Sequence, residues 1–109
     1  MDVSTPREFF EKVLPAKFNP AKTAGLETII QMKISGPAGG EWTLTLKDQK
    51  LEIKEGSHSA PSLAVEMSDK DFLDVVNEKV SGTSAFLNGK IKFRGSLSVA
   101  LKLRDLGLM

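Results

Sequence analysis

The sequence predicts an α+β domain in which a five-stranded, mostly antiparallel sheet carries helices packed on its apolar face. Five stretches alternate apolar and polar residues with a period of two, which is typical of half-buried strands. Two further stretches begin with a capping residue and place apolar residues on one helical stripe. No repeat or linker divides the 109 residues, so we expect a single domain over residues 1–109.

The first helix is expected to begin at Thr5 and Pro6. Thr5 can cap the helix, Pro6 suits the first helical position, and Glu8 can complete a capping box. The apolar stripe of this helix consists of Phe9, Phe10, Val13 and Leu14. Pro15 is expected to end or kink it, because proline lacks a backbone N–H and its ring clashes with the preceding turn.

Three strands are expected next, over residues 27–34, 42–47 and 51–54. A glycine-rich turn at Gly36–Gly40 and a short reversal at Asp48-Gln49 separate them, which indicates an antiparallel meander. Its apolar face is formed by Thr28, Ile30, Met32, Ile34, Trp42, Leu44, Leu46, Leu51 and Ile53.

The second half of the chain begins with a fourth strand over residues 63–67. Ser68 or Asp69 is expected to cap a helix whose apolar stripe consists of Phe72, Leu73, Val75 and Val76. A short helix from Ser81 through Phe86 leads to Asn88-Gly89, where both residues tolerate positive φ and a sharp turn is expected.

The last strand is expected over Lys90–Arg94, where alternation turns Ile91 and Phe93 inward and the basic residues outward. The following segment, Leu97–Leu103, suits a strand and a helix equally well by its periodicity. The residues by themselves leave these two alternatives open.

Composition limits the function classes. A net charge of +1 and a pI near 8.0 give no indication of a nucleic-acid partner. The absence of cysteine excludes disulfides, thiolate metal sites and a cysteine nucleophile. The charged N-terminal stretch is unlike a secretory signal, and no apolar run reaches the roughly 18 residues of a membrane span. We therefore expect a cytoplasmic protein.

Few residues could support catalysis, so we expect no enzyme, no cofactor and no metal. The single histidine, His58, lies in a polar loop and is expected to be solvated. Asp69 and Asp71 stand at a helix start, where they complement the helix dipole. The turn at Gly36–Gly40 lacks the Gly-Lys-Ser/Thr ending of a phosphate loop.

Lys90, Lys92 and Arg94 form a basic ladder on one strand face. Such a ladder can be a solvated outer face that also protects an edge. Alternatively it contacts phosphate groups, in a lipid head group, a coenzyme A moiety or a membrane surface. In the last case the protein would contact a membrane transiently.

The run from Ala85 to Leu103 resembles the C-terminal signature of the sterol carrier protein 2 (SCP-2) family. In that family an Ala-Phe pair leads through a Gly-Lys turn into a short strand, a glycine and a closing helix that ends in Lys-Leu. The matching residues here are Ala85-Phe86, Gly89-Lys90, Gly95 and Lys102-Leu103. The order of elements fits the family over nearly all of the chain, and the resemblance favours a helix for Leu97–Leu103.

The resemblance implies that sheet and helices enclose an apolar tunnel and that the protein binds and transfers a fatty acid, a fatty-acyl-CoA or a sterol. The residues expected to line the tunnel are Phe10, Leu14, Ile30, Met32, Ile34, Trp42, Leu44, Met67, Phe72, Val76, Phe86, Phe93, Leu97 and Leu101. Periodicity does not distinguish a hollow core from a filled one.

Two other functions stay open. One is a non-catalytic protein-interaction module that uses the apolar face to bind a partner. The other is an accessory domain of an enzyme, which we expect less because the sequence begins at Met1.

The C-terminal residues are unusually apolar for a chain end. Leu106, Leu108 and Met109 are expected to fold over the apolar interior, either as a lid over the tunnel mouth or as the last part of the core. The ending Gly107-Leu108-Met109 differs from Ser-Lys-Leu, so no peroxisomal address is expected.

Overall fold

A mixed five-stranded sheet forms the centre of the molecule, with strand order β3-β2-β1-β4-β5. The computed structural model describes residues 3–23, 25–57 and 60–102, without some side chains, among them those of Leu97 and Leu101. The strands are β1 (Thr28–Ser35), β2 (Gly40–Lys47), β3 (Lys50–Glu55), β4 (Leu63–Ser68) and β5 (Lys92–Gly95). All neighbours pair antiparallel except β1 and β4, which are parallel. The predicted meander and the mostly antiparallel sheet are confirmed.

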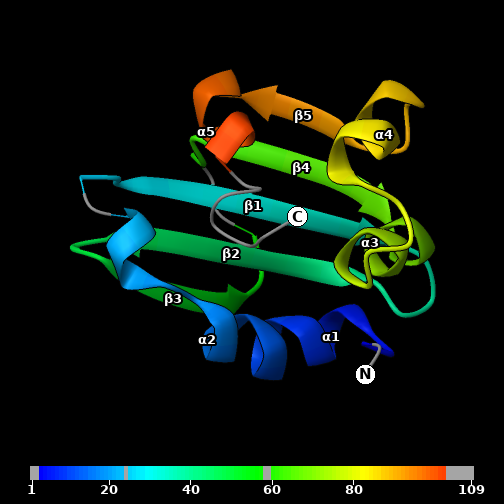
Figure 1. Ribbon diagram of the computed structural model, residues 1–109, viewed down its shortest axis with the longest axis horizontal. Helices are drawn as coiled ribbons and strands as arrows, with labels where there is room; N and C mark the ends of the chain where they lie inside the picture. The colour runs from blue at the N-terminus through cyan, green and yellow to red at the C-terminus, as the bar shows by residue number, and fades with distance from the viewer. Residues whose placement is uncertain (1–2, 24, 58–59, 103–109) are drawn as a thin grey trace.

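Helices precede and follow this sheet. The N-terminal helical segment comprises α1 (Pro6–Glu8), a π-helical turn (Phe9–Val13) and α2 (Leu14–Lys17), and a 3₁₀ turn (Pro20–Thr23) leads into β1. The later helices are α3 (Asp69–Val76), α4 (Gly82–Leu87) and α5 (Leu97–Lys102). Figure 1 shows the N-terminal helical segment along the β3 side of the sheet and α4 beside β5 at the opposite side.

The start of the first helix is as predicted, but its end is not. Thr5 Oγ1 accepts a hydrogen bond from the Glu8 amide at 3.1 Å, while Glu8 Oε1 accepts one from the Ser4 amide at 3.3 Å. Pro15 does not end the helical segment, which continues to Lys17. The turn before it widens, so that the Leu14 amide bonds to the Phe9 carbonyl, five residues back. A wide turn accommodates the missing N–H and the bulky ring of proline.

The Asn88-Gly89 pair ends a helix instead of forming a turn with two positive φ angles. Asn88 caps α4 with φ of −88°, and only Gly89 is left-handed, with φ of +74°. The Gly89 amide bonds to the Phe86 carbonyl and the Lys90 amide to the Ala85 carbonyl. This pair of bonds is a Schellman motif, which satisfies carbonyl groups at the C-terminal end of the helix. The ambiguous segment after Gly95 is helical over Leu97–Lys102, as the family resemblance predicted.

Aromatic side chains join the N-terminal helical segment to α3 and the sheet. Phe9 and Phe10 meet edge to face at 5.4 Å, and each also lies within 5.4 Å of the Phe72 ring. All three side chains are at most 1% exposed. Burial of several large rings in one cluster is a major share of the hydrophobic stabilisation of so small a domain.

Candidate ligand-binding cleft

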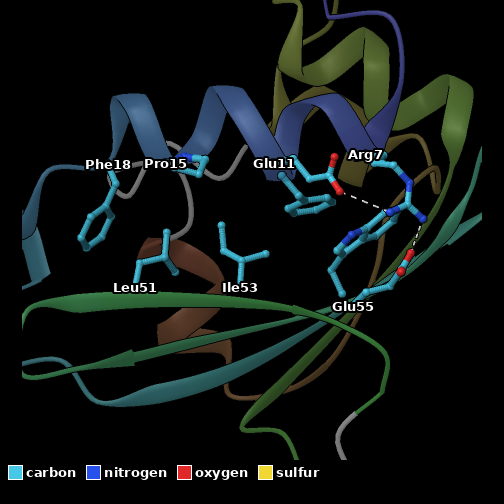
Figure 2. Close-up of a pocket in the computed structure, with 9 residues that line it drawn as sticks. Arg7, Glu11, Pro15, Phe18, Leu51, Ile53 and Glu55 are labelled. Carbon is cyan, nitrogen blue, oxygen red and sulfur yellow. Dashed lines mark hydrogen bonds and ion pairs between the residues drawn. The ribbon is translucent and has the colours of Figure 1, made fainter.

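A cavity of about 460 Å³ opens between the N-terminal helical segment and β3, and Figure 2 shows its lining. This volume is in the range of small-molecule sites. The lining residues are Arg7, Phe10, Glu11, Pro15, Phe18, Trp42, Leu51, Ile53 and Glu55. We call this cavity the cleft.

The walls of the cleft are mainly apolar because of where β3 lies in the sheet. β3 is an edge strand, and alternation turns Leu51 and Ile53 toward the N-terminal helical segment, where both stay half-buried. Pro15 and Phe18 face them from the end of that segment. The result is a groove with aliphatic and aromatic side chains on both sides.

One end of the cleft is charged. The Arg7 guanidinium donates to Glu11 Oε1 at 3.3 Å, one helical turn away, and to Glu55 Oε2 across the cleft (Figure 2). The three side chains are between 53% and 56% exposed. The hydrogen bond from Arg7 to Glu55 and the Glu55 charge raise the pKa of Arg7. Arg7 therefore stays cationic at every physiological pH and offers N–H donors to an anion.

The structure brings only part of the sequence-predicted lining to this cleft. Phe10 and Trp42 line it. Seven others are buried in the adjoining core, namely Leu14, Ile30, Met32, Ile34, Leu44, Met67 and Phe72. Val76 and Phe93 are partly buried against that core, whereas Phe86 is 46% exposed. The side chains of Leu97 and Leu101 lie outside the described part of the structure.

Sequence reasoning missed the polar end of the cleft. The four-residue spacing of Arg7 and Glu11 was a visible signal for a helical ion pair. The Arg7–Glu55 pair has no local signal, since 48 residues separate its members. Leu51 and Ile53 were recognised as inward-facing, but their place at the sheet edge, opposite a helix, depends on the strand order.

A second hollow, also of about 460 Å³, lies at the carboxyl ends of β1 and β4. Its lining residues are Lys33, Ile34, Ser35, Gly40, Glu41, Glu66, Met67, Ser68, Lys90 and Lys92. In contrast to the cleft, it is lined largely by polar and charged side chains. We call it the lysine hollow.

Asp69, at the start of α3, has a structural function. The Asp69 carboxylate accepts hydrogen bonds from the Ala38 amide at 3.0 Å and the Lys70 amide at 2.8 Å. Ser68 caps the helix by accepting from the Asp71 amide at 3.1 Å. Within the described residues there is no group of three or more potential metal ligands, and no helix is long and apolar enough to cross a membrane. His58 and the C-terminal residues 106–109 lie outside the described part.

Known proteins resemble the chain in sequence. It matches the SCP-2 sterol transfer family over residues 10–107. Hydroxysteroid dehydrogenase-like protein 2 of Xenopus laevis is 31% identical over 106 residues, which make up 96% of this chain and 25% of that protein. The chain thus spans a quarter or less of the length of such curated relatives.

Solved structures resemble the chain in fold. The crystal structure of sterol carrier protein 2 like 2 from Aedes aegypti has a TM-score of 0.75 at 21% identity, covering 92% of this chain and 94% of that one. The solution structure of palmitated SCP2L2 from the same organism has a TM-score of 0.70 at 21% identity, covering 100% and 96%. These likenesses confirm the predicted fold class.

Proposed function

The chain belongs to the SCP-2 sterol transfer family, and we propose from this premise that residues 1–109 form one lipid-binding domain whose cargo is a long-chain fatty acid. Membership of the family implies lipid binding and transfer in general terms. The particular ligand, its place in the cleft and the residues that hold it are our proposal.

The observation that carries the proposal is the amphipathic lining of the cleft. Apolar side chains form both walls, and the cationic Arg7 stands at one end. A fatty acid anion has the same division into a long apolar chain and a charged head. A palmitated relative of the same fold supports a fatty acyl chain as the cargo.

Arg7 is the proposed anchor of the carboxylate. Its guanidinium can form charge-assisted, bidentate hydrogen bonds with a carboxylate. At present it bonds to Glu55 and Glu11, whose side chains are more than half exposed and can turn away into water. An incoming carboxylate would take over these donors without leaving a buried charge unpaired.

Burial of the acyl chain supplies the driving force for binding. Each methylene removed from water contributes about 0.8 kcal/mol. Phe10 and Trp42 line the cleft and are themselves almost fully buried. We propose that the acyl chain of the ligand extends from the cleft past these rings into the apolar interior. This binding needs no catalytic group.

Transfer between membranes in the cytoplasm is the proposed role of this binding. A fatty-acyl-CoA would place its acyl chain in the cleft with the coenzyme in water, and a sterol would place its rigid ring system there. Such a carrier needs to bury the lipid, to hold its polar head at the mouth of the cleft and to release it. It needs to catalyse no reaction.

Calorimetric titration of delipidated protein with palmitate, palmitoyl-CoA, hexadecanol and cholesterol tests the proposal. We expect palmitate to bind with one molecule per chain. Arg7→Gln should weaken palmitate roughly tenfold, because charge-assisted hydrogen bonds are lost, while leaving hexadecanol nearly unchanged. Lys54→Gln, an exposed cation on the other face of β3, is the matched control. If none of the four compounds binds, the proposal is rejected.

A further inference from the structure

Thr28 is the first residue of β1 and carries a buried hydroxyl group that the fold leaves unpaired. The residue is 6% exposed, and among the described residues its Oγ1 is the one buried side-chain nitrogen or oxygen without a hydrogen-bond partner. Alternation places it on the inner face of the sheet together with Ile30 and Met32, which are fully buried. Folded proteins rarely leave a buried polar group unpaired, so a partner for this hydroxyl is to be expected.

The other buried polar side chains of the described residues, those of Gln31 and Thr43, are paired. Both lie on the outer face of the sheet, opposite each other on β1 and β2. The Thr43 hydroxyl is 2.9 Å from the Gly56 carbonyl oxygen and 3.2 Å from Gln31 Oε1. Gln31 Nε2 donates to the same Gly56 carbonyl at 3.4 Å. A buried threonine hydroxyl is thus satisfied on one face of the sheet and unsatisfied on the other.

Neither packing nor a water molecule accounts for the Thr28 hydroxyl. Valine has nearly the same shape, and it would fill this place without burying an unpaired polar group. An internal water needs about two to four polar partners, whereas the inward neighbours of Thr28 are Ile30 on its own strand and Leu46 across on β2. The hydroxyl therefore points to a polar group that arrives with a ligand.

Thr28 stands in one row of the sheet with the apolar end of the cleft. It pairs with Leu46 of β2, which pairs with Leu51 of β3 in the cleft lining. Glu55, the partner of Arg7, lies four residues further along β3. Strand spacings place the backbones of Thr28 and Glu55 about 16 Å apart, which is shorter than an extended long-chain fatty acid. A ligand that follows the proposed path from Arg7 into the interior can thus bring the distal half of its chain to Thr28.

We infer that the Thr28 hydroxyl is a second anchor of the ligand and that the preferred cargo is a fatty acid with a hydroxyl group in the distal half of its chain. A threonine hydroxyl donates one hydrogen bond and accepts others, so it complements a ligand hydroxyl. The second group has to be uncharged, because a charge without a partner is costly to bury. The inference rests on the proposed function, in which Arg7 holds the carboxylate end.

Calorimetric titration of the full, delipidated chain with stearate, 12-hydroxystearate and 2-hydroxystearate tests the inference. We expect the original chain to bind 12-hydroxystearate at least as tightly as stearate. Thr28→Val should weaken 12-hydroxystearate roughly tenfold and leave stearate within about twofold, because only the hydroxylated chain would then bury an unpaired group. The hydroxyl of 2-hydroxystearate lies beside the carboxylate, so this compound should respond as stearate does. Thr28→Ser keeps a hydroxyl and should retain the preference for 12-hydroxystearate.

The matched control is Thr43→Val, which is the same substitution at the satisfied hydroxyl. It should lower the melting temperature of the lipid-free chain, because the Thr43 hydrogen bonds are lost, and leave the preference for 12-hydroxystearate unchanged. Thr28→Val should instead leave this melting temperature unchanged or raise it, since it removes an unpaired buried group. Neither threonine lines the cleft, so both variants keep its walls and Arg7.

Three results would overturn the inference. If Thr28→Val changes the affinities for stearate and 12-hydroxystearate by the same factor, the residue does not contact the ligand hydroxyl. A lower melting temperature of lipid-free Thr28→Val would mean that the hydroxyl already has a partner in the free chain. If the original chain binds 12-hydroxystearate more weakly than stearate, the interior rejects a second polar group. Stearate binding without the expected preference rejects this inference alone, whereas no binding of any of these fatty acids rejects the proposed function.

Discussion

Phe10 stacks on Trp42, with the ring centroids 4.7 Å apart and the ring planes 26° from parallel. Both residues line the cleft, although their exposed fractions are only 1% and 3%. Phe10 also stacks on Phe72 of α3 at 5.3 Å. The floor of the cleft is thus part of the aromatic cluster that holds the N-terminal helical segment on the sheet.

Phe10→Ala should therefore reduce the free energy of unfolding by about 3–5 kcal/mol, because it removes a fully buried ring and leaves a cavity. Urea denaturation followed by Trp42 fluorescence measures this change. Phe86→Ala is the comparison, since Phe86 makes a ring contact but is 46% exposed, and it should cost less than half as much. Equal costs would mean that Phe10 is not a central support of the fold.

Glu55→Gln should strengthen palmitate binding by up to about fivefold. Glu55 competes with the ligand carboxylate for Arg7, and an exposed ion pair of this kind contributes little to stability. The same titration applied to Glu52→Gln provides the control. Glu52 is on the same strand but pairs with Lys54 on the other face. Weaker palmitate binding by Glu55→Gln would show that Glu55 supports the site instead of competing for it.

The elements of this fold could be predicted because their signals are local. Alternation located all five strands, and Ser68 was identified as a candidate cap from the residue itself. The helix over Leu97–Lys102 is different, because its periodicity was ambiguous and only the family resemblance favoured the correct structure.

The features that sequence reasoning missed are set by contacts between distant residues. The π-helical turn before Pro15 contains Phe9 and Phe10, whose rings pack on the distant Phe72, whereas local rules allow proline simply to end the helix. Burial of Gln31 and Thr43 on the outer face depends on the loop after β3, whose Gly56 carbonyl accepts a bond from Thr43 at 2.9 Å. The expected tunnel lining was chosen from the apolar residues that alternation places on the inner face of the sheet. Alternation does not show which of these inner residues border an opening.

Gly95→Ala should destabilise the chain more than Gly89→Ala does. Both glycines have positive φ, of 109° and 74°. A Cβ at Gly89 meets open space, so alanine there incurs only the left-handed penalty of roughly 1–2 kcal/mol. A Cβ at Gly95 would lie 2.3 Å from the Ser62 carbonyl oxygen, where β5 pairs with β4.

Thermal melts of both glycine variants, with hydrogen exchange of β5 amides, measure the difference. The Gly95 variant should lose protection across β5, because the Ser96 amide bonds to that same Ser62 carbonyl at 2.9 Å. Similar melting temperatures for the two variants would mean that the close approach of the chains at Gly95 relaxes without cost.

Ile53→Trp should block the cleft without unfolding the chain. Ile53 is half-buried on the edge strand β3 and faces Pro15 and Phe18 across the cavity. A larger side chain there can fill the space of about 460 Å³ from the exposed side, so overpacking strain should stay small. We expect palmitate affinity to fall at least roughly tenfold, because the methylenes of the ligand can no longer lie between the walls of the cleft.

Lys54→Trp adds the same side chain on the opposite face of the strand, where the lysine is 75% exposed, and should leave palmitate affinity unchanged. Calorimetry gives both affinities, and circular dichroism verifies that both variants are folded. If Ile53→Trp binds palmitate as tightly as the original chain, the ligand does not pass through the cleft and must reach the interior by another path.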